Sequence, residues 1–441
     1  AAPPPSLTLP QAISFAAAHH PALSAAVEQT AASQSATRIA RAAYLPRLDA
    51  IWQTNRATSN NIIGLLMPQS VVPPISGPPF PASSSDSAWG TAAGALLSWE
   101  PFDLGLRDAT VSEANAGLAR TTAGEAVTRL AVQHGVAFSW LAVATAQQVV
   151  TAADADIRRR EVLGRTVHTL VEQQLRPGVD ASRADAELAS ARIRAIQARQ
   201  ALALAEASLA RALGAPDPVR VDSDALLAAT SPVATQADTT HPLAAAGQAA
   251  VDEARAREAV LARTDRPRLY LQSSLSGRGS GIDTDGTFRG GASGLGFDRA
   301  NWAAGVQVVF PNLFDFATLH ARQSAASALT RAESARLNET TLVITSERRA
   351  ADAQVQATTA IAGQTPIQLV AARQTETQAR ARYDAGLASV VEVAEAQNLL
   401  AAAESQDAAA KVDVWRARLA QAVAAGDIAL LLDALTAAGV Q

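Results

Sequence analysis

Histidines, aspartates and glycines are the residues that could do chemistry in this sequence, because their spacing in places resembles known functional patterns. His20 and His241 each precede a proline and form no HExxH zinc pattern, so a place at the start of a helix is favoured over metal binding. Asp283-Thr284-Asp285-Gly286 resembles the start of a calcium loop, but it lacks the later glutamate and also fits a polar turn. The glycines within 290–296 form no GxGxxG motif, and neither a Walker sequence nor a catalytic triad signature is present. The sequence therefore predicts no catalytic residue, no metal and no cofactor.

Composition narrows the class of protein further. The 37 basic and 41 acidic residues are mixed along the chain, so there is no basic surface for nucleic acid and no polybasic membrane anchor. The absence of cysteine excludes disulfides, thiolate catalysis and cysteine-based metal sites. The first residues, Ala1 to Pro5, contain neither a charged n-region nor an apolar h-region, so we expect a secretory signal to be either absent or already cleaved. Whether the native N-terminus carries a lipid stays open.

The chain consists of two similar halves, which we place at residues 1–222 and 223–441. Four pairs of landmarks keep the same order in both halves: His20-Pro21 and His241-Pro242, Pro46-Arg47-Leu48 and Pro267-Arg268-Leu269, Trp89 with Phe102-Asp103 and Trp302 with Phe314-Asp315, and Arg176-Pro177-Gly178-Val179 and Asp384-Ala385-Gly386-Leu387. Four landmarks in one order are a poor fit to chance similarity, so a duplicated fold is predicted.

Each half is predicted to run helix, strand, strand, long helix and shorter helix. The predicted elements are alanine-rich entry helices over Leu7 to Ala43 and about Gln236 to Thr264, strands near 44–58, 88–101, 266–277 and 301–312, long helices near 103–176 and 315–385 that Asp103 and Asp315 could cap, and shorter helices that return to Gly214 and Gly426. The first long helix would extend ~110 Å, and the entry and return helices of one half, placed end to end, would match it. Such lengths indicate the wall of a tube rather than a globular core.

The second strand of each half alternates so that one face is apolar with an aromatic residue at each end. Trp89 and Trp99 end this stripe in the first half, and Trp302 and Phe310 end it in the second. This pattern is typical of a lipid-facing strand in a membrane barrel. A soluble β-sandwich would explain one alternating strand, but not the same aromatic ends in both halves. We therefore expect these four residues at the two membrane interfaces.

No helix is expected to cross the membrane. Residues 130–153 lack formal charge, but polar side chains interrupt their apolar character, so a helix packed among other helices is favoured. A membrane span must then be a closed barrel. Four strands cannot close one, two chains would give eight strands around a filled interior, and three chains would give twelve around a lumen. The sequence therefore predicts a homotrimer.

These features resemble the TolC family of outer-membrane efflux proteins over essentially the whole chain. The matching text includes the duplicated order, the early His-Pro, the Phe-Asp before each long helix, and the turn Tyr383-Asp384-Ala385-Gly386-Leu387 followed by Glu392-Val393. The resemblance implies a mainly α protein whose trimeric, twelve-stranded membrane β-barrel continues as a long α-helical tunnel in the periplasm. It also implies a periplasmic adaptor protein and an inner-membrane transporter as partners, within a tripartite efflux or type I secretion system.

The resemblance further assigns roles at the far end of the tunnel, which the family closes with inward-curling hairpins. Tyr383, Glu392 and Glu395 hold the positions of the family's closing tyrosine and acidic pair. Two carboxylates three residues apart share a helical face, so three copies would form two acidic rings that prefer cations. The alternative is the solvated face of an ordinary helix. A member of the family has an arginine two residues after the glycine where this chain has Ala388, and Ala184 stands at the first-half position of the acid.

The hairpin turns are the expected docking points for the adaptor, with a left-handed glycine in each. They comprise Pro177, Gly178 and Val179 in the first half and Gly386, Leu387 and Ala388 in the second. Two alternatives remain for the whole protein. One is an outer-membrane enzyme or receptor, which should carry a plug or a catalytic cluster, and the sequence shows neither. The other is a soluble helical scaffold or adaptor that uses its long helices as coiled coils. Such a protein would purify without detergent.

Overall fold

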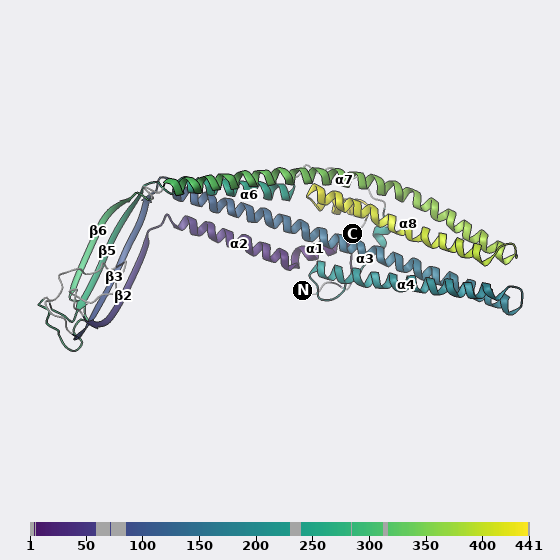
Figure 1. Ribbon diagram of the computed structural model, residues 1–441, viewed down its shortest axis with the longest axis horizontal. Helices are drawn as coiled ribbons and strands as arrows, with labels where there is room; N and C mark the ends of the chain where they lie inside the picture. The colour runs from purple at the N-terminus through teal and green to yellow at the C-terminus, as the bar shows by residue number, and fades with distance from the viewer. Residues whose placement is uncertain are drawn as a thin grey trace. The chain divides into compact units, whose positions relative to one another are not determined.

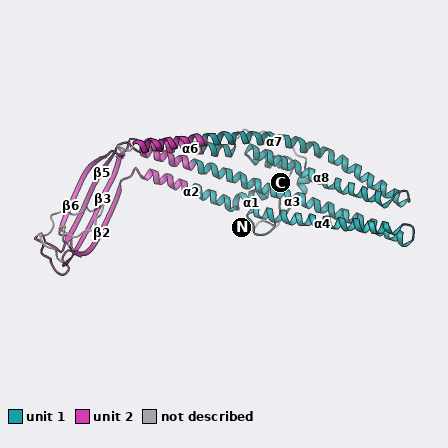
Figure 2. Ribbon diagram, in the orientation of Figure 1, with its two compact units in different colours: residues 1–31, 119–249, 334–441 teal, residues 32–118, 250–333 magenta. Residues whose placement is uncertain are grey.

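The computed structural model describes residues 4, 6–58, 71, 85–229, 240–283, 285–311 and 316–439, and it contains the helices and strands drawn in Figure 1. The chain divides into two compact units (Figure 2). One consists of 1–31, 119–249 and 334–441, and the other of 32–118 and 250–333. Each unit therefore takes segments from both predicted halves.

The second unit contains a four-stranded antiparallel sheet in the order β2-β3-β5-β6. The strands are β2 (Arg47–Thr58), β3 (Ser87–Phe102), β5 (Arg268–Ser280) and β6 (Arg299–Val309). The four strands lie at the predicted places with shifted ends, and β5 runs three residues past its predicted end at 277. Position 312 and the candidate cap Asp315 lie outside the described residues.

The turn from β3 into α3 (Leu106–Glu172) is closed by Asp103, as predicted for a cap. One carboxylate oxygen accepts from the backbone N–H of Gly105 at 3.0 Å, and the other accepts from that of Arg107 at 2.7 Å. The Arg107 guanidinium binds the same carboxylate at 2.8 Å and lies over the Tyr44 ring. These contacts bind the end of β3 to the first turn of α3.

The first unit is helical, and Figure 1 shows its two hairpins. Its helices, some of which contribute residues to both units, are α1 (Leu9–His19), α2 (Pro21–Ala42), α3, α4 (Gly178–Leu213), α5 (Asp224–Ala228), α6 (Pro242–Leu261), α7 (Phe316–Asp384), α8 (Val390–Ala425) and α9 (Ala429–Ala437). The predicted entry helix from Leu7 to Ala43 is wrong as a single element. It breaks at His20, whose backbone is extended because Pro21 follows.

The core of the first unit joins both halves of the sequence. Trp140 and Leu141 of α3 pack with Trp415 and Leu419 of α8 in one buried cluster. The Trp140 indole N–H donates to the Leu7 carbonyl at 3.0 Å, which holds β1 (Ser6–Leu7) beside β4 (Arg220–Val221). Of the described helices, α3 alone is long and apolar enough to cross a membrane, but a core helix has the same composition, and Trp140 and Leu141 are buried.

The short helices meet end to end, as their lengths predicted. Gly214, the left-handed C-cap of α4, lies against His20 and Pro21 at the start of α2. Gly426, the left-handed C-cap of α8, lies against His241 and Pro242 at the start of α6. Both histidines therefore stand at helix starts, as expected. Nowhere in the described chain do three acidic or histidine residues gather in a metal-binding group.

Candidate functional site

One face of the sheet is apolar across all four strands. Directly paired residues in a sheet share a face, and successive residues alternate between faces. The register joins Leu48 to Leu97, Trp99 to Leu271, and Leu271 to Val306, so these side chains lie on one face. The exposed apolar residues of this face, called the apolar band below, are Leu48, Trp52, Leu97, Trp99, Phe102, Leu275, Trp302, Val306, Val308 and, just beyond β6, Phe310. An exposed apolar band that covers four strands marks a surface that contacts lipid or another protein.

The other face of the sheet carries most of its polar side chains. It carries Asp49, Gln53, Asn55, Glu100, Gln272, Ser274, Arg278 and Gln307. Asp283, in the loop after β5, forms an ion pair with Arg289, and Asp285 accepts the Thr287 backbone N–H at 2.9 Å. Asp283 and Asp285, which resembled the start of a calcium loop in the sequence, therefore belong to a polar turn. Thr284 lies outside the described residues.

Three of the four predicted interface aromatics are exposed in the apolar band. Trp302 is 80% exposed, and Trp99 and Phe310 are exposed as well. The Trp99 indole N–H donates to the Tyr44 carbonyl at 3.0 Å, which is the amphipathic placement expected at an interface. Trp89 is instead partly covered, because the Arg56 guanidinium lies 5.8 Å from its ring.

Sequence reasoning missed Phe102 as a band residue. Phe102 and Trp99 are three residues apart, so simple alternation places them on opposite faces. A register shift between them puts both on the apolar face, with Trp99 opposite Leu271 and Phe102 opposite Leu269. The Pro101 between them is the one signal that could have indicated a bulge.

The two hairpin turns share one geometry. In the first, the Leu175 N–H donates to the Leu170 carbonyl and the Gln174 N–H to that of Val171, both at 2.9 Å. In the second, Leu387 donates to Arg382 at 2.8 Å and Gly386 to Tyr383 at 3.0 Å. Both are Schellman turns, which need a left-handed residue just past the helix end. That residue is Gly386 (φ 74°) in the second turn and Gln174 (φ 58°) in the first.

The predicted alignment of the two turns is therefore wrong by four residues. Gly178 is not the counterpart of Gly386, because it is the first residue of α4 and its φ is not positive. The matching pairs are Gln174 with Gly386 and Arg176 with Ala388, an offset of 212 that also relates the caps Gly214 and Gly426. The two turns were aligned in the sequence on their glycines, so the left-handed glutamine, Gln174, was overlooked.

At the position of Ala388, a family member has an arginine, and the offset of 212 places Arg176 at the equivalent position of the first turn. Arg176 holds the equivalent place in the first turn and crosses to the second. Its guanidinium lies 4.7 Å from the centre of the Tyr383 ring and donates to the carbonyls of Tyr383 and Ala388, both at 3.4 Å. One arginine therefore binds both turns of the chain together.

Tyr383 is buried beneath Arg176, with 1% of its surface exposed, in a cluster with Leu163, Val167, Ala184 and Val393. Burial raises the pKa of its hydroxyl, and Asp180 and Asp384 act in the same direction while Arg176 opposes them. The hydroxyl makes no hydrogen bond within the described residues. Tyr383 therefore contacts Arg176 of the first turn through its ring and its backbone carbonyl, and not through its hydroxyl.

Glu392 and Glu395 are both exposed, on one face of the first two turns of α8. Glu392 also closes a capping box: the Ser389 N–H donates to its carboxylate at 3.2 Å, and its own N–H donates to the Ser389 hydroxyl at 3.3 Å. With the offset of 212, the first-turn counterpart of Glu392 is Asp180 rather than Ala184. Each hairpin thus has an acid at the third position of its returning helix.

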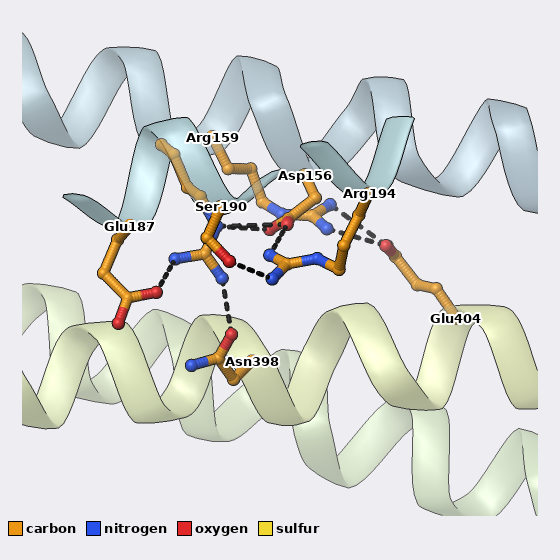
Figure 3. A network of polar contacts seen from close by, with 8 residues as sticks. Asp156, Arg159, Glu187, Ser190, Arg194, Asn398 and Glu404 are labelled. Carbon is orange, nitrogen blue, oxygen red and sulfur yellow. Dashed lines mark hydrogen bonds and ion pairs between the residues drawn. The ribbon is translucent and has the colours of Figure 1, made fainter. Parts of the chain in front are cut away.

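A buried polar network that the sequence did not reveal joins the two hairpins (Figure 3). Arg160 of α3, 2% exposed, binds Asp156 at 3.0 Å, Glu187 of α4 at 2.8 Å and Asn398 of α8 at 2.6 Å. Arg159 binds Glu404 of α8 through two bonds of 3.2 and 2.8 Å. Arg160 and Asp156 are four residues apart, the one signal available from sequence, but many helix-surface pairs share that spacing.

Comparisons with known proteins show which proteins this chain resembles in sequence and in fold. Residues 12–215 match the family described as Outer membrane efflux protein. VceC from Vibrio cholerae, an outer membrane protein, shares 19% identity with a TM-score of 0.73 over 95% of this chain and 96% of that one. The CmeC outer membrane channel of Campylobacter jejuni shares 16%, with a TM-score of 0.75 over 95% and 85% of the two chains.

Residues 12–215 carry the family match, and the whole chain has the fold of these outer membrane proteins. The open-state MtrE channel of Neisseria gonorrhoeae adds a third likeness, at 18% identity and a TM-score of 0.72 over 95% of this chain and 89% of that one. No curated protein matches the sequence significantly. The solved structures share the fold of this chain, and the family match over residues 12–215 indicates an outer membrane efflux protein.

The geometry of the two hairpin turns gives a matched test. Gly386→Ala should cost about 1–2 kcal/mol, because an L side chain is strained in the left-handed region. Gly178→Ala should cost nothing, since its φ is ordinary and no atom lies within 4 Å of the added methyl. Gln174→Gly should instead stabilise the first turn. Thermal unfolding of the detergent-extracted protein measures all three, and equal shifts for the two alanine variants would contradict the assignment.

Proposed function

We propose that the efflux protein forms a homotrimeric passive duct, in which three sheets close a twelve-stranded outer-membrane barrel and the helices form a periplasmic tunnel. The apolar band carries this proposal, because it reaches from edge strand β2 to edge strand β6. In the described sheet β2 pairs only with β3 and β6 only with β5. Hydrocarbon cannot satisfy free strand edges, whereas pairing of β6 with β2 of the next copy does.

The opposite face suits a water-filled lumen. Its glutamines, serines and charged residues would be costly against lipid and are ordinary against water. The same alternation disfavours the soluble-scaffold alternative, because a scaffold has no use for a ten-residue exposed apolar band.

Cysteine cross-linking tests closure directly, because the natural chain has no cysteine background. Thr54→Cys on β2 is combined in turn with a cysteine at each of residues 302–308 on β6, in native membranes. We expect oxidation to give covalent trimers for one register of pairs, and a detergent-extracted mass three times the 45.5 kDa of the chain. Extraction without detergent, or no cross-link at any position, would refute the barrel.

The hairpin turns are proposed to dock a periplasmic adaptor that connects the duct to an inner-membrane transporter. Leu175, Val179 and Leu387 are exposed apolar side chains at these turns. Exposed apolar side chains that gather at one place on a protein often mark a surface that binds a partner. Replacing Val179 and Leu387 by glutamate should abolish adaptor cross-linking while the trimer persists, and unchanged cross-linking would refute docking here.

Glu392 and Glu395 are proposed to line the narrow end of the duct as two acidic rings. Replacing both by glutamine should reduce the preference for cations and relieve block by divalent cations in planar bilayers. Glutamine can keep the capping-box bond of Glu392, so the fold should be preserved and the change should report charge alone. If selectivity and block stay unchanged, the two glutamates are a solvated helix face and the gate lies elsewhere.

A further inference from the structure

His241 lies at a joint between two helices, with only 4% of its surface exposed. Its Nδ1 accepts the backbone N–H of Leu243 at 3.1 Å, which caps the start of α6. Its Nε2 lies 3.1 Å from the carbonyl of Val423, in the last turn of α8. The ring therefore connects the end of one helix to the start of the next.

These two partners determine the protonation state of the ring. A backbone N–H can only donate, so Nδ1 must be without a proton. A carbonyl can only accept, so Nε2 must carry one. Only the neutral tautomer with the proton on Nε2 satisfies both contacts. A second proton on Nδ1 would point at the Leu243 N–H and remove the cap.

We propose that His241 is an acid-sensitive joint, at which protonation releases the start of α6 from the end of α8. The inference is independent of the duct function, since it needs only the helices of the first unit. It does bear on that function, because α8 runs from this joint to the second hairpin turn.

The charged groups around the ring act in both directions. On α7, Arg348 opposes a positive ring and Glu347 favours one. The Arg348 guanidinium binds the Ala424 and Ala425 carbonyls at 3.0 and 3.4 Å, so it is fixed at the same helix end. The last turn of α8 presents backbone carbonyls, and beyond it Asp427 accepts the Ala429 N–H at 2.8 Å. The α6 N-terminus disfavours a cation, and the α8 C-terminus favours one.

Burial is the largest of these effects and lowers the pKa of His241 below its ordinary value of 6.5. A lowered folded-state pKa means that the unfolded chain binds the proton more readily. The stabilisation by the neutral ring is thus fully present above pH 6.5 and is lost as the pH falls through the folded-state value. The joint should loosen under mild acid and not under base.

The first half of the chain contains a built-in control. His20 also caps a helix, accepting the Ala22 N–H at 3.2 Å, and also lies against a C-cap glycine. It is less buried, however, and in the described structure its Nε2 is bound to no carbonyl. The counterpart of Arg348, at the offset of 212, is Val136. Only the second joint has the closed, two-sided arrangement.

Hydrogen exchange of the intact detergent-extracted protein, corrected for intrinsic rates, tests the proposal between pH 7.5 and 5.0. Wild type should lose roughly fivefold protection at the start of α6 and the end of α8, the size of one lost cap. The start of α2 should change less. His241→Asn keeps a capping oxygen that does not titrate, so it should abolish the acid response, whereas His20→Asn should leave it intact.

Two results would overturn the proposal. One is equal protection at both pH values for the α6 start in wild type, which needs no variant and so cannot be blamed on misfolding. The other is an acid response that persists in His241→Asn, which would assign the response to another group. A failure of the barrel cross-links would leave these outcomes unaffected.

Discussion

Arg160→Met should destabilise the helical unit by about 3 kcal/mol. Removing one partner from a buried ion pair leaves an uncompensated charge and typically costs about 3–5 kcal/mol. The low end applies here, because Asp156 keeps Arg194 at 2.9 Å and Glu187 is partly open to water. Asn398 of α8 would lose its bond to Arg160, so the damage should extend to the second hairpin.

A second arginine on the same pair of helices provides the control. Arg199 of α4 binds Asp154 of α3 at 2.8 Å, but its side chain is 59% exposed. Exposed ion pairs contribute about 0–1 kcal/mol, so Arg199→Met should change little. Thermal or denaturant unfolding of the two variants in one detergent gives the comparison. Equal losses would show that the network of Figure 3 is no more than a set of surface pairs.

The location of the network gives it a second consequence. Arg159 and Arg160 are contributed by the first hairpin, and Glu404 and Asn398 by the second. Nearer the turns, Arg176 repeats this connection through Tyr383. The two hairpins of one chain are therefore connected at two places along their length, first by the polar network and then by Arg176 and Tyr383. Any movement that separates α8 from α3 must break charged bonds at the first level as well as the stacked ring at the second.

The sheet could be predicted from the sequence to within a few residues because its signal is local. Alternation with a period of two depends only on near neighbours such as Trp302, Ala304 and Val306, and one apolar face keeps that pattern strict. What alternation could not show is the register shift beside Phe102, since a bulge changes the face without changing the composition.

The hairpin turns were harder to predict because their signal depends on pairing. A left-handed position can be recognised in a sequence only where a glycine occupies it. In the first turn Gln174 takes that conformation instead. The long helices supply enough packing to hold a strained glutamine, so the sequence shows no penalty there.

The polar network could not be predicted from the sequence either, because it too depends on pairing between distant segments. Its members are up to 245 residues apart, and only the folded hairpins bring Arg159 to Glu404.

Val306→Arg should cost about 2–4 kcal/mol in membrane assembly, the price of a cation on the lipid face at the bilayer midplane. Val306 lies at the centre of the exposed stripe from Trp302 to Phe310. Gln307→Arg is the matched control, since the neighbouring side chain points to the polar face and should tolerate the charge. Yield of folded trimer in the outer membrane, compared at equal expression, measures both. If Val306→Arg assembles as well as Gln307→Arg, the apolar band does not face lipid, and the sheet must be covered by protein instead.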